Sequence, residues 1–309
     1  MRIIISGGSG MVGSRLAREL AKDGHEVIIL SRSPGKNRDR FGPGIKVVGW
    51  DGKTAAGWGS LADGADAIVN LVGENLAGDH LIPSRWTETR KRAILESRLQ
   101  PGHAIVEAVQ QAQTKPRLLI QSSAVGYYGP RGDEKITEGA GHKDDFLSQV
   151  CVQWEASTEA VETVGVRRII IRSGIILDKD QGSLPRMTMP FTFFVGGPIG
   201  SGKQWISYIS IDDEVKAIRF LLEEEEAEGV YNLTTPNPVT NKEFENAIGK
   251  VTNRPSWFPV PAFLMKLLFG EMSMVLLEGQ RVLPERLLEA GFEFDYPDAV
   301  SSLQAVLKR

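Results

Sequence analysis

Hydrophobic and polar residues along this chain follow two periods, one typical of buried strands and one typical of amphipathic helices. Short apolar runs that predict strands fall at Ile3–Ile5, Glu26–Leu30, Lys46–Asp51, Ala67–Gly73, Leu118–Ser123, Arg168–Arg172 and Gly229–Leu233. Segments with helical spacing lie at about Met11–Asp23, around Arg85–Arg98, and at Ala104–Gln113, Gln149–Thr163 and Asp212–Glu226. Apolar strands that alternate with helices predict an α/β fold, in which helices cover both faces of a parallel sheet.

The pattern is less regular in the rest of the chain. Gly182–Gln204 is rich in Gly and Pro, and we expect a long excursion there rather than a regular element. Trp205–Ile209 alternates like a strand. From Pro236 onward the spacing is helical with breaks, as far as Gly291-Phe292.

A glycine-rich turn joins the first predicted strand to the first predicted helix. Its glycines fit two registers, Gly8-x-Gly10-x-x-Gly13 and Gly7-x-x-Gly10-x-x-Gly13. Glycines let the backbone approach a diphosphate, whose negative charge is attracted by the free N–H groups of the helix start. An ordinary tight turn is the alternative, but the position between an N-terminal strand and a helix favours a dinucleotide site.

The end of the second predicted strand bears on the choice of dinucleotide. NAD-binding folds usually place Asp or Glu here, whereas a basic residue accommodates the 2′-phosphate of NADP. The strand ends with Leu30-Ser31-Arg32 and offers no carboxylate, so we expect NADP(H) in preference to NAD(H). A solvated surface arginine is the alternative for Arg32. Asp51 is placed to meet an adenine edge, and Gly73 ends the fourth strand where the backbone should pass close to the cofactor.

Composition and charge exclude several classes of protein. The formal net charge of -3 provides no basic surface for nucleic acid or an anionic membrane. No apolar run approaches the roughly 20 residues that span a bilayer. The single cysteine, Cys151, excludes an internal disulfide and suits a reducing compartment. Because Met1 runs directly into the first strand and leaves no room for a signal peptide, we expect a soluble, cytoplasmic protein.

Two other candidate sites are set aside. Gly197–Lys203 matches a phosphate-binding P-loop, but Gln204 stands where the motif needs the Ser or Thr that binds magnesium. We therefore do not expect hydrolysis of nucleoside triphosphates. No metal site is expected, because the histidines have no ligand spacing with one another or with the cysteine. The histidines are His25, His80, His103 and His142.

The order of these motifs resembles the extended short-chain dehydrogenase/reductases, in the sugar-nucleotide epimerase-like branch. More narrowly, nearly the whole chain is similar to the epimerase-family subgroup that has a C-terminal domain of unknown function. The resemblance rests in the first half on Gly7-x-x-Gly10-x-x-Gly13, Asn70–Gly73, Arg85-Trp86, Ser97-Arg98 and Ser122–Gly129. In the second half it rests on Trp154-Glu155, Arg172–Leu177, Gly196–Gln204, Gly279–Pro284 and Gly291–Phe294.

The resemblance implies a Rossmann-type doubly wound parallel sheet that binds NADP(H), with a smaller, mostly helical C-terminal lobe. It divides the chain into a Rossmann domain at 1–235, with a substrate-lobe excursion at about 178–205, and a C-terminal substrate-lobe domain at 236–309. Extended relatives often dimerise through a helical face, so a homodimer is compatible with the resemblance. The expected cofactor contacts are Gly7, Ser9, Gly10, Met11, Val12, Gly13, Ser31, Arg32, Asp51, Leu71, Val72, Gly73 and Ser122.

The usual catalytic pair of the family is absent. Members normally carry Tyr-x-x-x-Lys after the fifth strand, where the tyrosinate exchanges a proton with the substrate and the lysine lowers its pKa. In this chain the pattern places Cys151 at the tyrosine and Glu155 at the lysine. A carboxylate there would raise a neighbouring pKa instead, so the usual relay cannot operate.

Two interpretations of the chemistry remain. In one, the chain is an NADP-dependent oxidoreductase or epimerase in which Tyr127 or Tyr128 supplies a phenol beside Ser123, or Glu155 acts as the base. In the other, the fold binds NADP without turnover and serves as a regulator or scaffold. We expect Cys151 to be a small buried hydrophobe rather than a reactive thiol. Of the two tyrosines, we expect one to pack and one to face the substrate.

The excursion also bears on the substrate, because in extended relatives this region helps to form the substrate pocket. Here it is apolar and aromatic, with Met187, Met189, Phe191, Phe193 and Phe194. Such a lining fits an unidentified small hydrophobic molecule at least as well as a nucleotide-sugar, whose diphosphate needs basic partners. The alternative is a loop pinned to the core by its aromatic side chains. Two roles are equally compatible with the position of Arg98. It could contact the cofactor or a substrate anion, or it could pair with another side chain on a helix surface.

Overall fold

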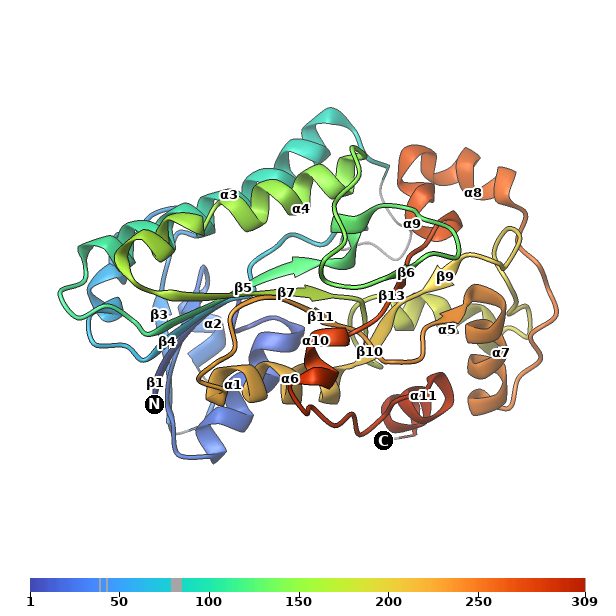
Figure 1. Ribbon diagram of the computed structural model, residues 1–309. Helices are drawn as coiled ribbons and strands as arrows, with labels where there is room; N and C mark the ends of the chain where they lie inside the picture. Colours follow the sequence, from blue (N-terminus) through green and yellow to red (C-terminus); the bar gives the residue numbers. More distant parts are fainter. Residues whose placement is uncertain (39, 43, 79–84, 309) are drawn as a thin grey trace.

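A seven-stranded parallel sheet forms the centre of the molecule (Figure 1). The structure is a computed structural model, and it describes every residue except 39, 43, 79–84 and 309. The strand order is β11-β7-β5-β4-β1-β2-β3. The strands are β1 (Arg2–Ser6), β2 (Glu26–Ser31), β3 (Ile45–Gly49), β4 (Ala67–Asn70), β5 (Leu118–Ala124), β7 (Arg167–Ser173) and β11 (Gly229–Leu233). The seven strands predicted for this sheet are confirmed, although β3 and β4 end before the predicted Asp51 and Gly73.

Helices cover both faces of the sheet, as the continuous apolar strands predict. In Figure 1, α3 (Glu88–Gln111) and α4 (Phe146–Ala156) lie above the sheet, and α1 (Met11–Lys22) and α6 (Ile211–Glu223) lie below it. Alternate strand residues serve the two cores. Ile3 and Ile5 pack with the lower helices, whereas Ile4 packs with the upper ones.

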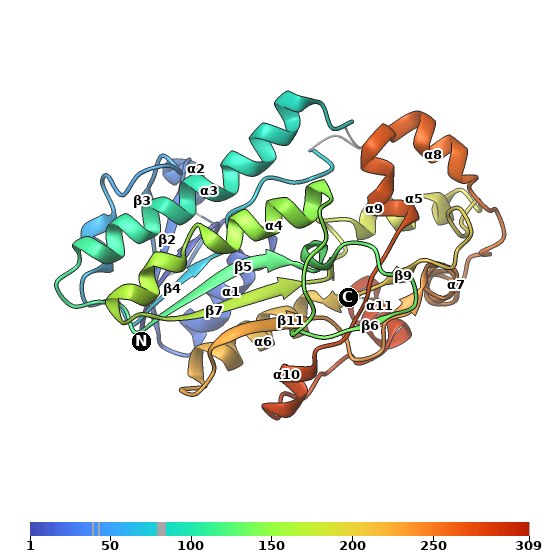
Figure 2. The same ribbon diagram turned by 45° about the horizontal axis from the view of Figure 1, so that its top comes forward.

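The two helical segments predicted at Arg85–Arg98 and Ala104–Gln113 form one helix, so that division was wrong. α3 continues through Pro101, which removes a single backbone hydrogen bond. Buried residues on both sides of the proline, Ile94 and Ile105 among them, hold the helix on the protein core. Figure 2 shows α3 and α4 running side by side. A side chain at Gly102 would not fit between them, because an added Cβ would lie 2.0 Å from Ser157 Oγ.

The excursion at Gly182–Gln204 also contains a helix that the sequence analysis missed. Pro185 stands in the first turn of α5 (Leu184–Thr192), where a missing N–H costs nothing. The predicted strand at Trp205–Ile209 is divided between two small sheets, because β9 (Trp205–Ile206) pairs with β12 (Val239–Thr240), and β10 (Tyr208–Ser210) pairs with β8 (Ile175–Leu177).

Helices dominate the C-terminal part of the chain. They are α7 (Asn241–Thr252), α8 (Ala262–Phe269), α9 (Met274–Leu277), α10 (Glu285–Glu289) and α11 (Ala299–Leu307), of which α11 lies beyond the predicted pattern. The same part contains β13 (Arg281–Val282) and a 3₁₀ helix at Gly270–Ser273. The short elements elsewhere are α2 (Pro34–Arg38), β6 (Lys135–Ile136) and the 3₁₀ helices at Gly59–Ala62, Val125–Tyr128 and Glu159–Val164.

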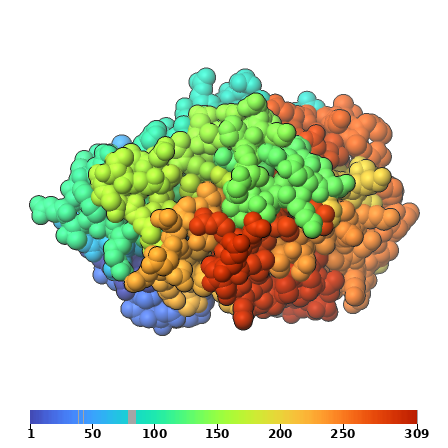
Figure 3. Space-filling model, viewed as in Figure 1, coloured from blue at the N-terminus to red at the C-terminus, as the bar shows by residue number. Residues whose placement is uncertain are grey.

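The C-terminal segment contributes to two cores. Phe244, Ile248 and Leu303 form a separate core with α5, whereas Leu287 and Phe292 are buried with the helices below the sheet. β13 pairs with β6, and in Figure 3 the red end of the chain lies against the green segment that contains β6. The division at residue 235 stays a prediction. Within the described residues, no helix is long and apolar enough to cross a membrane.

Candidate functional site

The carboxyl edge of the sheet has its topological switch point at β1, which lies between β2 and β4. Ligands of doubly wound folds bind in the crevice that such a reversal creates. A ladder of buried polar side chains crosses this edge. Ser6 Oγ donates to Asn70 Oδ1 (2.6 Å), and Asn70 Nδ2 donates to Gln121 Oε1 (2.9 Å). The ladder ties β1, β4 and β5 together directly behind the glycine turn.

The glycine turn has the geometry of a dinucleotide cradle. Gly7 has a positive φ of 74°, and an added Cβ there would lie 2.8 Å from the Leu71 carbonyl carbon. An added Cβ at Gly13 would lie 2.5 Å from the Gly7 carbonyl oxygen. Gly10 begins α1 without any side-chain cap. The first N–H groups of α1, from Met11 to Gly13, are therefore directed out of the helix end, which suits a diphosphate.

Arg32 lies immediately beyond β2, on the other side of this turn. Its side chain is exposed, and no partner bonds to its guanidinium within the described residues. The neighbouring Ser31 is buried, and its hydroxyl accepts from Asn37 Nδ2 (2.9 Å) and from the backbone N–H of Ser33 (3.1 Å). Ser31 therefore shapes the loop, while Arg32 is free to meet an anionic group.

Asp51 is exposed, but its carboxylate is largely used by its own loop. Oδ1 accepts from the backbone N–H groups of Lys53 (2.8 Å) and Thr54 (2.9 Å), and Oδ2 accepts from the Thr54 hydroxyl (2.8 Å). These hydrogen bonds lower the pKa of Asp51, so the group stays ionised. The predicted adenine contact could use only the remaining lone pairs, and it stays a prediction.

The predicted contacts beyond β4 lie beside the turn. Leu71 contacts Gly7 as described, and the backbone N–H of Val72 donates to Asn70 Oδ1 (3.4 Å). Ser122 is half-buried in β5, and its carbonyl accepts from Gln121 Nε2 (2.7 Å). The expected cofactor residues of β1, β2 and β4 thus surround one edge of the sheet.

A buried polar cluster occupies the same edge at β5 and β7. Ser123 donates its hydroxyl hydrogen to Glu155 Oε1 (2.6 Å). The Glu155 carboxylate is paired with Arg172 through Nε to Oε1 (2.8 Å) and Nη2 to Oε2 (2.8 Å). Burial alone would lower the pKa of Arg172, but the hydrogen bonds and charge of Glu155 raise it, so the guanidinium is a permanent cation. The side chain at the usual lysine position is therefore half of a buried ion pair.

The two candidate tyrosines have different environments. Tyr128 is fully buried, donates to Asn232 Oδ1 (2.7 Å) and accepts from Arg172 Nη1 (3.1 Å). Burial raises its phenol pKa. Tyr127 is partly exposed, and its hydroxyl has no partner within the described residues. The Arg172 guanidinium lies 3.3 Å from the centroid of its ring. Tyr128 is therefore the packing residue of the pair, and Tyr127 is the one available to a ligand.

Cys151 is buried behind Ser123, as expected of a small hydrophobe. Burial, with the nearby charge of Glu155, raises the pKa of its thiol to about 11. The thiol is therefore protonated at neutral pH and cannot replace a tyrosinate.

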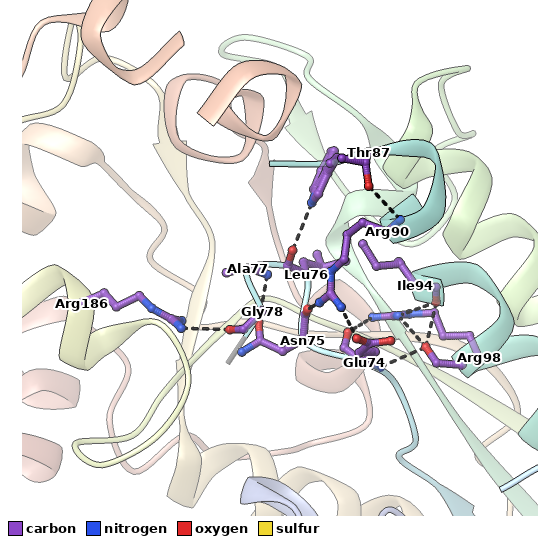
Figure 4. A network of polar contacts seen from close by, with 12 residues as sticks. Glu74, Asn75, Leu76, Ala77, Gly78, Thr87, Arg90, Ile94, Arg98 and Arg186 are labelled. Carbon is purple, nitrogen blue, oxygen red and sulfur yellow. Dashed lines mark hydrogen bonds and ion pairs between the residues drawn. The ribbon is translucent and has the colours of Figure 1, made fainter. Parts of the chain in front are cut away.

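Arg98 is neither exposed nor paired on a helix surface, so that alternative was wrong. The residue is 7% exposed and lies under the loop that follows β4. Figure 4 shows arginines of α3 and α5 directed at this loop. Arg98 Nη2 donates to the Glu74 carbonyl (3.1 Å), Arg90 bonds to the Asn75 carbonyl and the Glu74 carboxylate, and Arg186 Nη2 donates to the Gly78 carbonyl (3.0 Å). Glu74–Gly78 are thus held by side chains of α3 and α5.

Arg172 lies opposite Ser123 in the β5–β7 register, a role that the sequence did not predict. The available signal was a charge at the end of a buried strand, which needs a partner. Asn232 in β11 and Glu138 were also missed. The Asn232 backbone N–H donates to Glu138 Oε1 (3.0 Å), and burial raises the pKa of Glu138. The only feature of the sequence that could have indicated them was a polar residue close to apolar residues.

The side chains of the excursion divide between core and surface. Phe191 is 1% exposed and pinned into the C-terminal core, as the loop alternative predicts. Phe193 and Phe194 are 71% and 51% exposed. His80 lies outside the described residues. Among those described, no group of three or more His, Cys, Asp or Glu side chains is arranged around a potential metal ion.

Comparisons with known proteins place these features in context. Residues 3–146 match the NAD dependent epimerase/dehydratase family, and residues 260–306 match a domain of unknown function, DUF1731. Epimerase family protein YfhF of Bacillus subtilis (strain 168) is 37% identical over 308 residues, which are 99% of this chain and 98% of that protein. The SDR39U1 homolog of Arabidopsis thaliana, a chloroplastic epimerase family protein, is 37% identical over 314 residues, covering 100% and 87% of the two chains.

A solved structure supports the same grouping. The crystal structure of human epimerase family protein SDR39U1 (isoform2) with NADPH is 32% identical to this chain. The two structures have a TM-score of 0.87 with 100% of each chain covered. The agreement confirms the predicted Rossmann-type sheet with its helical C-terminal part.

Proposed function

Because this chain belongs to the epimerase family, we propose that it is an NADP(H)-dependent oxidoreductase or epimerase of the extended short-chain dehydrogenase/reductase type. Its substrate would be a small molecule whose identity the site does not define. The observation that carries the proposal is the uncapped glycine turn at the switch point, with the unpaired Arg32 on one side and the Ser123 cluster on the other. The NADPH in the human relative supports the same cofactor.

The residues of the edge fit such a cofactor. The N–H groups from Met11 to Gly13 would hold the diphosphate, and Arg32 would pair with the 2′-phosphate. The bound cofactor supplies hydride transfer. NADP(H) is proposed over NAD(H) because no carboxylate follows β2 within Ser31–Arg38, and a cation does.

The proton would leave or arrive by a rearranged route. Ser123 already donates its hydrogen to Glu155, so its lone pairs can accept a hydrogen bond from a substrate hydroxyl. Glu155 would then act through Ser123 as the base. Tyr127 has an unpartnered hydroxyl with which to polarise the substrate oxygen. Tyr128 is not part of this route, because both of its hydrogen bonds are made inside the protein.

The cofactor part is tested by titrating the pure protein with NADPH and with NADH. We expect tighter binding of NADPH, and a specific loss of that advantage in Arg32→Asp, with Lys36→Asp as a control of equal charge change. Equal affinities for the two cofactors in the wild type would refute the role of Arg32.

The chemical part is tested by following NADPH absorbance over a panel of carbonyl compounds. Turnover should be lost in Ser123→Ala and Tyr127→Phe, but kept in Tyr128→Phe and Cys151→Ala. Activity that survives in both of the first two variants would reject the relay.

The second candidate function is a silent NADP-binding regulator or scaffold. It is favoured by one observation, the ion pair that occupies the position of the usual lysine. A protein that binds NADPH tightly but turns over no member of the panel would support it.

A further inference from the structure

Arg98 is a buried guanidinium without a carboxylate of its own. Its hydrogen bonds go to neutral acceptors, the carbonyls of Ile94 (2.8 Å) and Glu74 (3.1 Å) and the hydroxyl of Ser97 (3.4 Å). Its guanidinium also lies 4.8 Å from the centroid of the Trp154 ring. The Glu74 carboxylate bonds to Arg90 instead (Figure 4).

Burial of such a charge is costly when no counter-ion accompanies it. Desolvation lowers the pKa of Arg98 to about 10, so the side chain still carries its charge at neutral pH. The fold therefore maintains a buried positive charge to which no carboxylate bonds directly within the described residues.

This charge lies directly behind the proposed cofactor site. An added Cβ at Gly73 would lie 3.2 Å from Arg98 Cζ, and Gly73 follows the residues that contact the glycine turn. On the α4 side, Trp154 belongs to the same helix as Cys151, whose thiol packs beside Ser123. Arg98 thus lies between the end of β4 and the Ser123 cluster.

The topology indicates which half of the cofactor would face it. Arg32 follows β2, so the adenosine half would lie over the β1–β2 side of the switch point. The nicotinamide half must then extend over β4 and β5, toward Ser123. The buried charge is therefore on the side of the nicotinamide ring.

The oxidised nicotinamide ring carries a positive charge that the reduced ring lacks. We propose that Arg98 is a fixed buried charge that makes this protein bind NADPH in preference to NADP⁺. By linkage, the same preference raises the reduction potential of the bound cofactor. The inference rests on the proposed function and adds to it a direction of reaction.

The direction is oxidation of a substrate alcohol. The carbinol carbon would lose a hydride to the bound cofactor, the hydroxyl proton would pass through Ser123 to Glu155, and the substrate would become a carbonyl compound. A fixed positive charge favours this step because the positive charge of the nicotinamide ring is lost in it.

The test compares dissociation constants of NADPH and NADP⁺ for the full-length protein, by calorimetry. Arg98→Met and Arg98→Gln remove the charge, and we expect each to reduce the preference for NADPH about tenfold. That is the effect of two unit charges on the order of 10 Å apart at an effective dielectric constant of about 20. Tenfold corresponds to about 30 mV for a two-electron couple. Arg98→Lys keeps the charge and should keep the preference.

A matched control separates charge from loop support. The double variant Glu74→Gln/Arg90→Gln removes the neighbouring ion pair and a loop tether without changing the net charge. We expect it to weaken both forms of the cofactor equally. Thermal unfolding of each variant checks folding, and Arg98→Gln serves if Arg98→Met does not fold.

The outcomes distinguish the two levels of the proposal. The role of Arg98 alone would be overturned if Arg98→Met and Arg98→Gln kept the preference for NADPH over NADP⁺. It would also be overturned if the control double variant reduced that preference as much as they do. A wild-type protein that binds neither NADPH nor NADP⁺ would overturn the proposed function and this inference with it.

Discussion

Replacing Arg172 with Met should destabilise the folded protein by about 3–5 kcal/mol, because Glu155 would remain buried without its counter-ion. The side chains of Arg172 and Glu155 are only 4% and 10% exposed, so water could not replace the lost partner. The variant would also remove the hydrogen bond that Arg172 donates to Tyr128 (3.1 Å).

The loss of stability depends on whether a charged partner remains buried. Replacement of both partners by apolar residues of similar size is often neutral or even stabilising. The double variant Arg172→Met/Glu155→Met should therefore recover most of the loss. Arg172→Lys should fall between the wild type and Arg172→Met, since an ammonium cannot reproduce the bidentate pairing.

Urea unfolding followed by circular dichroism gives the free energies for a double-mutant cycle. We expect a coupling energy of several kcal/mol between the two positions, and little change for Arg117→Met, whose ion pair with Asp66 is exposed. A loss below about 1 kcal/mol in Arg172→Met, or additive effects in the double variant, would refute the reasoning.

Three further predictions concern other parts of the fold. Gly13→Ala should weaken NADPH binding at least about tenfold, because its methyl group would lie 2.5 Å from the Gly7 carbonyl oxygen, whereas Gly139→Ala, which meets nothing within 4 Å, should bind normally. Burial raises the pKa of Glu214 from 4.5 to about 8, so the folded state keeps a proton that the unfolded state releases. The contribution of Glu214 to stability should therefore fall by up to roughly 1.4 kcal/mol per pH unit between those values. Burial also raises the pKa of Glu245 to about 8, so Glu214→Gln should reduce the loss of stability between about pH 5 and about pH 8 in urea unfolding without abolishing it. Tyr128→Phe should cost about 1–3 kcal/mol, because Asn232 Oδ1 would lose its donor and Arg172 Nη1 its acceptor, while affinity for NADPH should not change; a larger effect on binding than on stability would contradict the packing role.

Local patterns in the sequence predicted the sheet and the glycine turn, both of which the structure contains. A buried parallel strand needs a continuous apolar run, and a tight strand-to-helix turn needs glycine, so both leave a mark within a few residues. Arg32 is informative for the same reason, because its position at a strand end follows from counting along the chain. Proline positions predicted the ends of helices less reliably, since Pro101 does not end α3 and Pro185 belongs to the first turn of α5.

The chemistry of the candidate site was decided only by tertiary structure. The partnership of Glu155 with Arg172 joins a helix to a strand, and the burial of Arg98 depends on how α3 packs against the sheet and α4. Neither contact can be predicted from the periodicity of the sequence, because a charged residue follows the same sequence pattern whether its side chain faces water or a buried counter-ion. The sequence by itself established that Tyr-x-x-x-Lys is missing, and the packing of α3, α4 and β7 determined which charges took its place.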